Sequence, residues 1–118
     1  MKRYLDAFGH AFNGIGYFIR NERNAKVHLG CTVVACTAGW LFSVNLYDWA
    51  LIISAITIVL IAEMFNSTIE KTLNLLHPEK ADAVKVIKDL AAAAVLIASF
   101  YAVAIAFIVF GPLLYRII

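Results

Sequence analysis

The length of its uncharged stretches is the feature that most restricts how this chain folds. Residues 27–46 and 90–110 contain no formally charged side chain, and a shorter apolar stretch covers residues 49–62. A helix needs about 20 apolar residues to cross the roughly 30 Å hydrocarbon layer of a bilayer. The first and last stretches meet that length, and the middle one meets it only if its helix continues through Glu63. We therefore predict three membrane-crossing helices.

The composition excludes several other classes of protein. Of the 118 residues, 63% are hydrophobic and 15% are charged, whereas soluble domains have roughly 45–50% apolar and 25% charged residues. The net charge of +2 comes from basic residues interleaved with acidic ones, which excludes a nucleic-acid partner. Cys31 and Cys36 lack the neighbouring ligands of a zinc site and are interpreted as small buried hydrophobic residues. The length supports a single domain, residues 1–118.

The N-terminal segment has the pattern of an amphipathic helix. Leu5, Phe8, Phe12, Ile15 and Ile19 recur at steps of three and four residues, which places them on one helical face. This helix could pack on a soluble core, but the apolar stretches that follow favour a position in the membrane interface. The fold class expected is therefore an all-α membrane protein, with a surface helix at 1–26 and membrane helices at 27–46, 49–75 and 84–115.

Turn residues and basic residues predict how the helices are connected and oriented. Tyr47 and Asp48 are expected to form the short turn that connects the first and second spans. Gly111 and Pro112 are expected to end the last helix. Lys and Arg gather on the cytoplasmic side of membrane helices. They occur here before the first span and between the second and third: Lys2, Arg3, Arg20, Arg23, Lys26, Lys71, Lys80, Lys85 and Lys88. We therefore expect the N-terminus and residues 66–89 to be cytoplasmic.

A repeat of alanine in the last span predicts contact with another helix. Ala94, Ala98, Ala102 and Ala106 are spaced by four residues, which permits close approach of a neighbouring helix. Three helices cannot enclose a large site by themselves, so we expect homo-oligomerisation. The alternative is that alanine serves here only as a good helix former.

Polar residues follow the middle apolar stretch at helical spacing. Glu63, Asn66, Glu70 and Asn74 lie within about 60° of one another on a helix and span about 16 Å of its axis. An ionisable group at the membrane boundary is unfavourable unless it has a partner or faces water. Two carboxylates about two turns apart allow one to accept a proton while the other helps to hold a hard cation. The alternative is a stripe that only marks where the helix leaves the bilayer.

Further polar groups are expected at the same cytoplasmic level. They precede the first and third spans: Glu22, Asn24, Lys26 and His28, then Lys85, Lys88 and Asp89. Together they predict a shared interfacial site, with weaker cases for His28 and His77. The alternatives are an i,i+4 pair between Glu22 and Lys26 and a Lys88 side chain that extends toward headgroups. Histidines at ligand spacing and a phosphate-loop Lys are both missing, which excludes zinc and P-loop sites.

Three segments resemble a known family. Residues 63–70 (EMFNSTIE) and 88–96 (KDLAAAAVL) are similar to the signature of the small prokaryotic diacylglycerol kinase and undecaprenol kinase family. Residues 22–29 (ERNAKVHL) resemble the pattern E-x-N-x-R-I-H-L of that family. The resemblance implies a homotrimeric enzyme of the bacterial inner membrane. It would transfer the γ-phosphoryl group of magnesium-bound ATP to a lipid hydroxyl, at sites between neighbouring subunits.

The resemblance also implies roles for individual residues. Glu63 corresponds to the catalytic carboxylate, and Glu22 with Glu70 to the pair that binds Mg²⁺ and, through it, ATP. The remaining substrate-binding or ATP-binding groups are Arg3, Asn66, Lys88 and Asp89. The sequence departs from the family at Asn74, where many members have an acid, at Ala93, where glycine is common, and at Lys26-Val27, which replaces Arg-Ile.

The substrate is the least constrained part of this interpretation. Residues 22–29 look more like the undecaprenol kinases, so we expect undecaprenol as the acceptor and undecaprenyl phosphate as the product. The alternative is diacylglycerol, which would give phosphatidic acid. A more distant alternative is a small proton-coupled transporter, because a lone acid near the edge of a short bundle can also bind protons.

Overall fold

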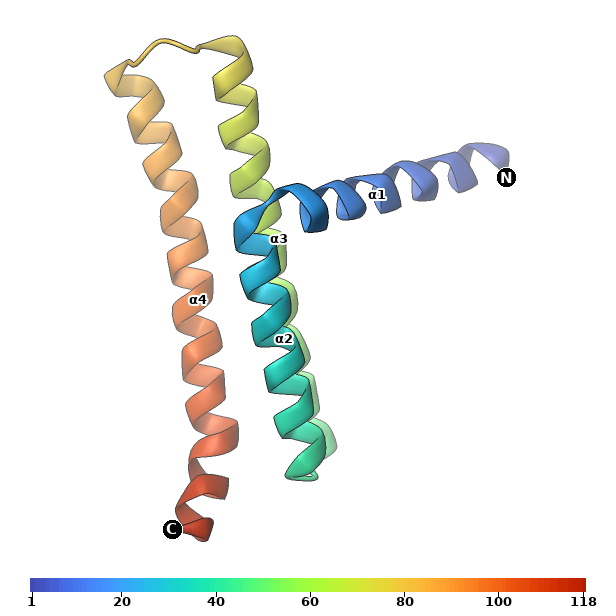
Figure 1. The fold of residues 1–118 in the computed structure, drawn as a ribbon, viewed down its shortest axis with the longest axis vertical. Helices are drawn as coiled ribbons and strands as arrows, with labels where there is room; N and C mark the ends of the chain where they lie inside the picture. The colour runs from blue at the N-terminus through green and yellow to red at the C-terminus, as the bar shows by residue number, and fades with distance from the viewer.

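A computed structural model describes all residues from 1 to 118 and consists of helices only (Figure 1). The four helices are α1 (Lys2–Asn21), α2 (Arg23–Leu41), α3 (Leu46–Leu76) and α4 (Asp82–Ile117). The prediction of an all-α chain is confirmed.

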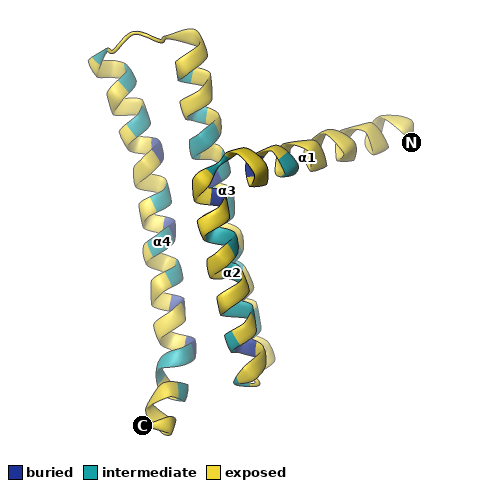
Figure 2. Ribbon diagram, viewed as in Figure 1, coloured by how far each residue is buried: buried dark blue, intermediate teal, exposed yellow.

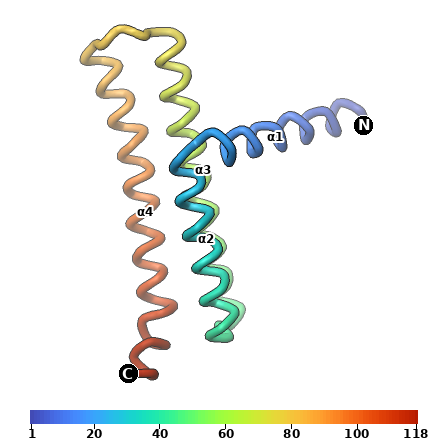
Figure 3. Tube along the Cα trace, in the orientation of Figure 1, coloured from blue at the N-terminus to red at the C-terminus, as the bar shows by residue number.

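The helices form a flat arrangement with α3 at its centre. α3 contacts both α2 and α4, and each of these runs antiparallel to it. α1 contacts the start of α2 and projects sideways from the other three helices, as the trace in Figure 3 shows. The molecule measures 54 × 44 × 20 Å. Such a geometry suits a membrane protein in which α1 lies on the membrane surface and the other three helices cross the bilayer.

The contact between α3 and α4 has a repeat of seven residues on α4. Ala91, Ala98 and Ile105 are buried, as is Val109, and the α4 residues Ile105 and Val109 form a cluster with Ile52 and Ala55 of α3. Most of the remaining helix surface is exposed or partly exposed (Figure 2). A chain this apolar exposes such surfaces to lipid or to further protein copies.

The alanine repeat of α4 is divided between two faces. Ala98 is buried and Ala102 packs against the α3–α4 cluster, whereas Ala94 and Ala106 are exposed. Half of the repeat therefore serves contact within one chain. Farther along the same interface, the hydroxyl groups of Ser54 and Tyr101 lie 3.1 Å apart and join α3 to α4 within the apolar region.

Two of the helices are long and apolar enough to cross a membrane. These are α3 and α4, whose most apolar windows have mean hydropathies of 2.0 and 2.6. α2 is not among them, because its charged first turn leaves about 15 uncharged residues, or about 22 Å of helix, after Lys26. The lengths and compositions of α3 and α4 are compatible with a membrane protein, and the crossing by α2 stays a prediction.

The predicted turn at Tyr47 and Asp48 is wrong. α2 ends at Leu41, and both residues belong to the first turn of α3. The reason is an N-cap: the Oδ1 atom of Asn45 accepts a hydrogen bond of 2.9 Å from the backbone N–H of Asp48, which satisfies a free donor of the helix end. Asp48 also carries negative charge at the positive end of α3. Here the polar residues begin a helix.

The other predicted helix ends are also shifted. The surface helix stops at Asn21, because Glu22 has an extended backbone (φ −98°, ψ 120°) and α2 begins directly after it. α4 continues through Pro112 to Ile117, so the predicted end at Gly111 and Pro112 is wrong. Proline removes one backbone hydrogen bond, and helices in membranes tolerate that loss when neighbouring groups compensate.

Gly39 of α2 is expected to be essential for the contact with α3. A Cβ atom at this position would lie 2.9 Å from the Trp49 ring, whereas one at Gly30 of the same helix would meet nothing within 4 Å. Gly39→Leu should therefore destabilise the protein by about 1–3 kcal/mol, the usual range for overpacking. Thermal unfolding in detergent micelles, followed by circular dichroism, measures the difference. Gly30→Leu is the matched control, and an equal loss in both variants would contradict the role of this contact.

Candidate active site

Glu63 is the buried charged residue of the chain. It lies on α3, and only 3% of its surface is exposed. Its Oε1 atom is 2.9 Å from Nε2 of His28 and accepts a longer hydrogen bond of 3.5 Å from Nδ2 of Asn24. A buried carboxylate requires such partners, because an isolated charge in an apolar environment is strongly unfavourable. The three side chains form a polar centre between α2 and α3.

Both partners of Glu63 come from the first two turns of α2. Asn24 and His28 are four residues apart and therefore share a helical face. The sequence alone gives a weaker case for His28 than for Glu22 or Lys88, although its spacing from Asn24 is a usable signal. The contact with Glu63 could not be found from spacing within one helix, since it depends on which faces of α2 and α3 meet.

Glu22 joins the α1–α2 corner to α3. Its Oε1 atom is 2.9 Å from Nζ of Lys71, and the same ammonium group lies 5.4 Å from the centre of the Tyr17 ring of α1. The hydrogen bond and the negative charge of Glu22 raise the pKa of Lys71 above its ordinary value. Lys71 is therefore cationic at neutral pH. This pair replaces the alternative of a bond between Glu22 and Lys26.

Asn66 and Glu70 continue along α3 from Glu63. The Oδ1 atom of Asn66 is buried and has no hydrogen-bond partner, which is uncommon for a polar atom in a folded protein. Glu70 is exposed and directly precedes Lys71, the partner of Glu22. No three acidic, histidine or cysteine side chains are arranged so that they could hold a metal ion by themselves. The available oxygen ligands near this level are those of Glu22, Asn66 and Glu70.

The other residues of the predicted site, Lys88, Asp89 and Arg3, lie away from Glu63 in the single chain. Nζ of Lys88 donates a hydrogen bond of 2.7 Å to Oδ1 of Asn74, and Asp89 pairs with Lys85 at 2.6 Å. Asn74 follows Glu63 by eleven residues, or about 16 Å of helix. Arg3 lies near the exposed start of α1. One subunit therefore brings α2 and α3 together around Glu63 but does not bring Lys88, Asp89 or Arg3 to it.

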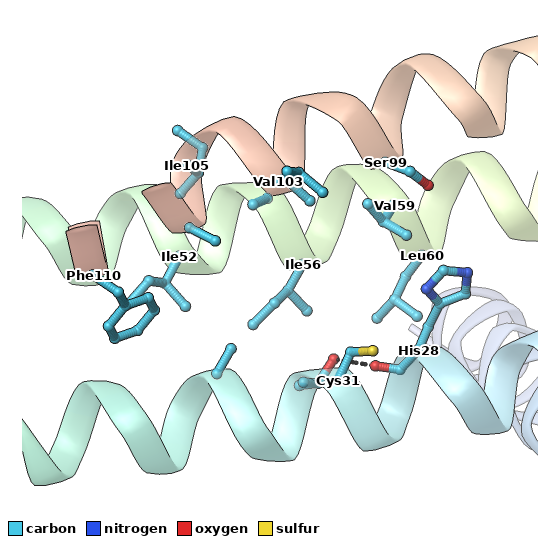
Figure 4. A pocket seen from close by; sticks show the side chains of 15 residues that line it. His28, Cys31, Ile52, Ile56, Val59, Leu60, Ser99, Val103, Ile105 and Phe110 are labelled. Atoms are coloured by element: carbon cyan, nitrogen blue, oxygen red, sulfur yellow. Dashed lines mark hydrogen bonds between the residues drawn. The ribbon is translucent and has the colours of Figure 1, made fainter. Parts of the chain in front are cut away.

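An apolar cavity of about 370 Å³ lies between α2, α3 and α4 (Figure 4). Its walls include Ile52, Ile56 and Leu60 of α3 and Phe110 of α4, and the imidazole of His28 lies at one end. Ligand sites commonly have this size and consist of apolar walls with a few polar groups. The cavity therefore offers space for part of an apolar molecule whose polar end meets the His28–Glu63 pair.

The chain is similar in sequence to known bacterial kinases. The chain is 29% identical over 112 residues to the undecaprenol kinase of Bacillus subtilis, covering 95% of this chain and 91% of that protein. It is 31% identical over 98 residues to a diacylglycerol kinase of Pseudomonas aeruginosa, covering 83% and 80%. A diacylglycerol kinase of Synechocystis is 30% identical over 100 residues, which are 84% of this chain and 57% of that kinase.

The family comparison covers most of the chain, including the segments around Glu22, Glu63 and Lys88. Residues 9–110 match the prokaryotic diacylglycerol kinases. The structure adds a buried carboxylate, apolar helices of membrane-crossing length and a cavity with apolar walls. The chain belongs to the prokaryotic diacylglycerol kinase family and is a lipid kinase.

Proposed function

We propose that this protein transfers the γ-phosphoryl group of ATP to the hydroxyl group of undecaprenol, giving undecaprenyl phosphate. The observation that carries this proposal is the buried carboxylate of Glu63, held 2.9 Å from His28 at one end of an apolar cavity. A lipid alcohol has matching chemistry, with a long apolar body and one terminal hydroxyl. Membership of a lipid kinase family supports this function over a proton-coupled transporter.

Glu63 has the role of the catalytic carboxylate. The O–H bond of the lipid breaks, its oxygen forms a bond to the γ-phosphorus, and the bond from that phosphorus to ADP breaks. The proton released by the lipid is finally taken up by Glu63. Phosphoryl transfer requires little covalent chemistry from the protein, so positioning and charge stabilisation supply most of the rate enhancement.

Oxygen ligands at the α1–α2 corner and on α3 could hold a magnesium ion together with substrate phosphates. Mg²⁺ is usually bound by one or two carboxylates together with substrate phosphates and waters, so Glu22 and Glu70 suffice as charged ligands. The unpartnered Oδ1 atom of Asn66 supports this assignment. When bound, the ion would neutralise charge on the phosphate oxygens of ATP.

Arg3, Lys88 and Asp89 are proposed to bind ATP in an assembled homotrimer. Within one chain, Lys88 and Asp89 are engaged by Asn74 and Lys85, at a distance along α3 from Glu63. A neighbouring subunit can supply these groups to a site that is incomplete in the single chain. The exposed Ala94 supports such contact, because small residues allow helices to approach closely.

The proposed site lies where the cytoplasm meets the inner membrane. We place α1 in the interface with its exposed Leu5, Phe8 and Phe12 toward lipid, and α2, α3 and α4 across the bilayer. The N-terminus and residues 66–89 are then cytoplasmic, as the basic residues favour. ATP reaches the site from water while the lipid stays in the bilayer.

Turnover of two alcohols tests the choice of substrate. The purified protein in lipid vesicles, given ATP labelled at the γ-phosphate, is expected to phosphorylate undecaprenol with a higher kcat/KM than diacylglycerol. Both reactions are followed by extraction of labelled lipid, and each alcohol is present at the same mole fraction. A higher kcat/KM for diacylglycerol would support phosphatidic acid as the product, and labelling of neither alcohol would contradict the proposed activity.

A further inference from the structure

We propose that His28 is a second catalytic residue, which carries the proton from the lipid hydroxyl to Glu63. The inference rests on the proposed function and deepens it. Its basis is the position of His28, because this side chain contacts Glu63 and also lines the apolar cavity. Glu63 does not line that cavity. A hydroxyl group in the cavity therefore meets His28 before it meets the carboxylate.

The proposed relay starts from an ionised Glu63 and a neutral His28. An ionised carboxylate can only accept hydrogen bonds, so Nε2 of His28 is then the donor in its contact of 2.9 Å with Oε1 of Glu63. Nδ1 of the same neutral ring is then a free acceptor. A histidine held in one tautomer by a carboxylate is the arrangement that general-base catalysis uses in unrelated enzymes.

The proton transfer balances without any further reactant. The lipid O–H bond breaks as its oxygen attacks the γ-phosphorus, and the proton forms a bond to Nδ1 of His28. The proton on Nε2 moves to Oε1 of Glu63, and ADP leaves with the electron pair of the broken P–O bond. The ring is again neutral, with the opposite tautomer, and the protein has gained one proton at Glu63.

Burial and exposure support this order of transfer. The side chain of Glu63 is 4% exposed, whereas that of His28 is 22% exposed. In Figure 4 the imidazole ring lies at the same end of the cavity as Leu60 and Ser99. Asn24 approaches Glu63 only at 3.5 Å and has no atom that can both accept and release a proton at neutral pH. His28 is the neighbour of Glu63 with the chemistry of a relay.

His28→Gln and His28→Ala test the relay. Glutamine keeps an N–H donor at a similar distance from the backbone but cannot transfer a proton, so kcat is expected to fall by about 100-fold or more, with the KM for ATP within about twofold of the wild-type value. His28→Ala should be equally slow and should regain activity when imidazole is added. Glu63→Gln should not respond to imidazole. His10→Gln, the same substitution at an exposed histidine of α1, is the matched control and should keep the wild-type kcat.

The outcomes separate the relay from the proposed function. Wild-type kcat in His28→Gln, or no rescue of His28→Ala by imidazole, would overturn the relay while leaving the lipid kinase intact. Full activity of Glu63→Gln would instead contradict the role proposed for that carboxylate. Circular dichroism and the elution volume of each variant exclude a folding defect as the cause of a lower kcat.

Discussion

Glu63→Gln is expected to lower the kcat for lipid phosphorylation by about 10²- to 10⁴-fold, the usual contribution of a general base. The change keeps the size of the side chain and its ability to accept a hydrogen bond from His28. It removes the negative charge that takes up the proton of the lipid hydroxyl. Initial rates with saturating ATP and undecaprenol in vesicles measure the effect, and the KM for ATP should change little because Glu63 binds no phosphate in this proposal.

The control for Glu63→Gln is the same substitution at an exposed acid. Glu79 lies in the connection between α3 and α4, where its carboxylate is 3.0 Å from His77. Glu79→Gln should retain the wild-type kcat. If Glu63→Gln folds, assembles and turns over lipid like Glu79→Gln, the buried carboxylate has only a structural role.

Removal of divalent cations is expected to have the second large effect. A chelator should abolish lipid phosphorylation, and added Mg²⁺ should restore it, because the ion neutralises the phosphate charge that develops during transfer. Replacement of the proposed ligands, in Glu22→Gln and Glu70→Gln, should raise the Mg²⁺ concentration for half-maximal activity by more than about tenfold, since even outer-shell partners of metal ligands change affinity by about 10- to 100-fold. A titration of the rate with Mg²⁺ at fixed ATP gives this value.

Asp82→Asn provides the comparison for the magnesium titration. Asp82 is an exposed acid in the first turn of α4, so its loss changes the net charge by the same amount as either glutamate substitution. The Mg²⁺ requirement of Asp82→Asn should equal that of the wild type. A similar shift in all three variants would indicate a general electrostatic effect and would remove Glu22 and Glu70 as ligands.

Much of the fold followed from hydropathy, while the helix ends did not. Uncharged stretches predicted α3 and α4 because burial in lipid requires long apolar helices. The ends depend on local hydrogen bonds, and hydropathy does not report these. Asn45 begins α3 through its side-chain cap, and Pro112 remains inside α4. The spacing of Asn45 three residues before Asp48 is the sequence signal that places the turn before α3 correctly.

The candidate site was partly predictable for a similar reason. Spacing on one helix placed Glu63, Asn66 and Glu70 together, because 3.6 residues complete a turn. It could not show that His28 would meet Glu63, since that contact depends on how α2 is rotated against α3. Nor could it show that Lys88 would bind Asn74 in the single chain. Contacts between helices are set by packing over their whole length, which short motifs do not contain.

The break between α1 and α2 consists of a single residue, and that residue is Glu22. At its backbone the chain turns from the direction of α1 to that of α2, and its side chain forms an ion pair with Lys71 of α3. A change in the tilt of α1 must therefore also move the carboxylate of Glu22. In such a molecule, the contact of α1 with its surroundings and the orientation of a proposed magnesium ligand change together.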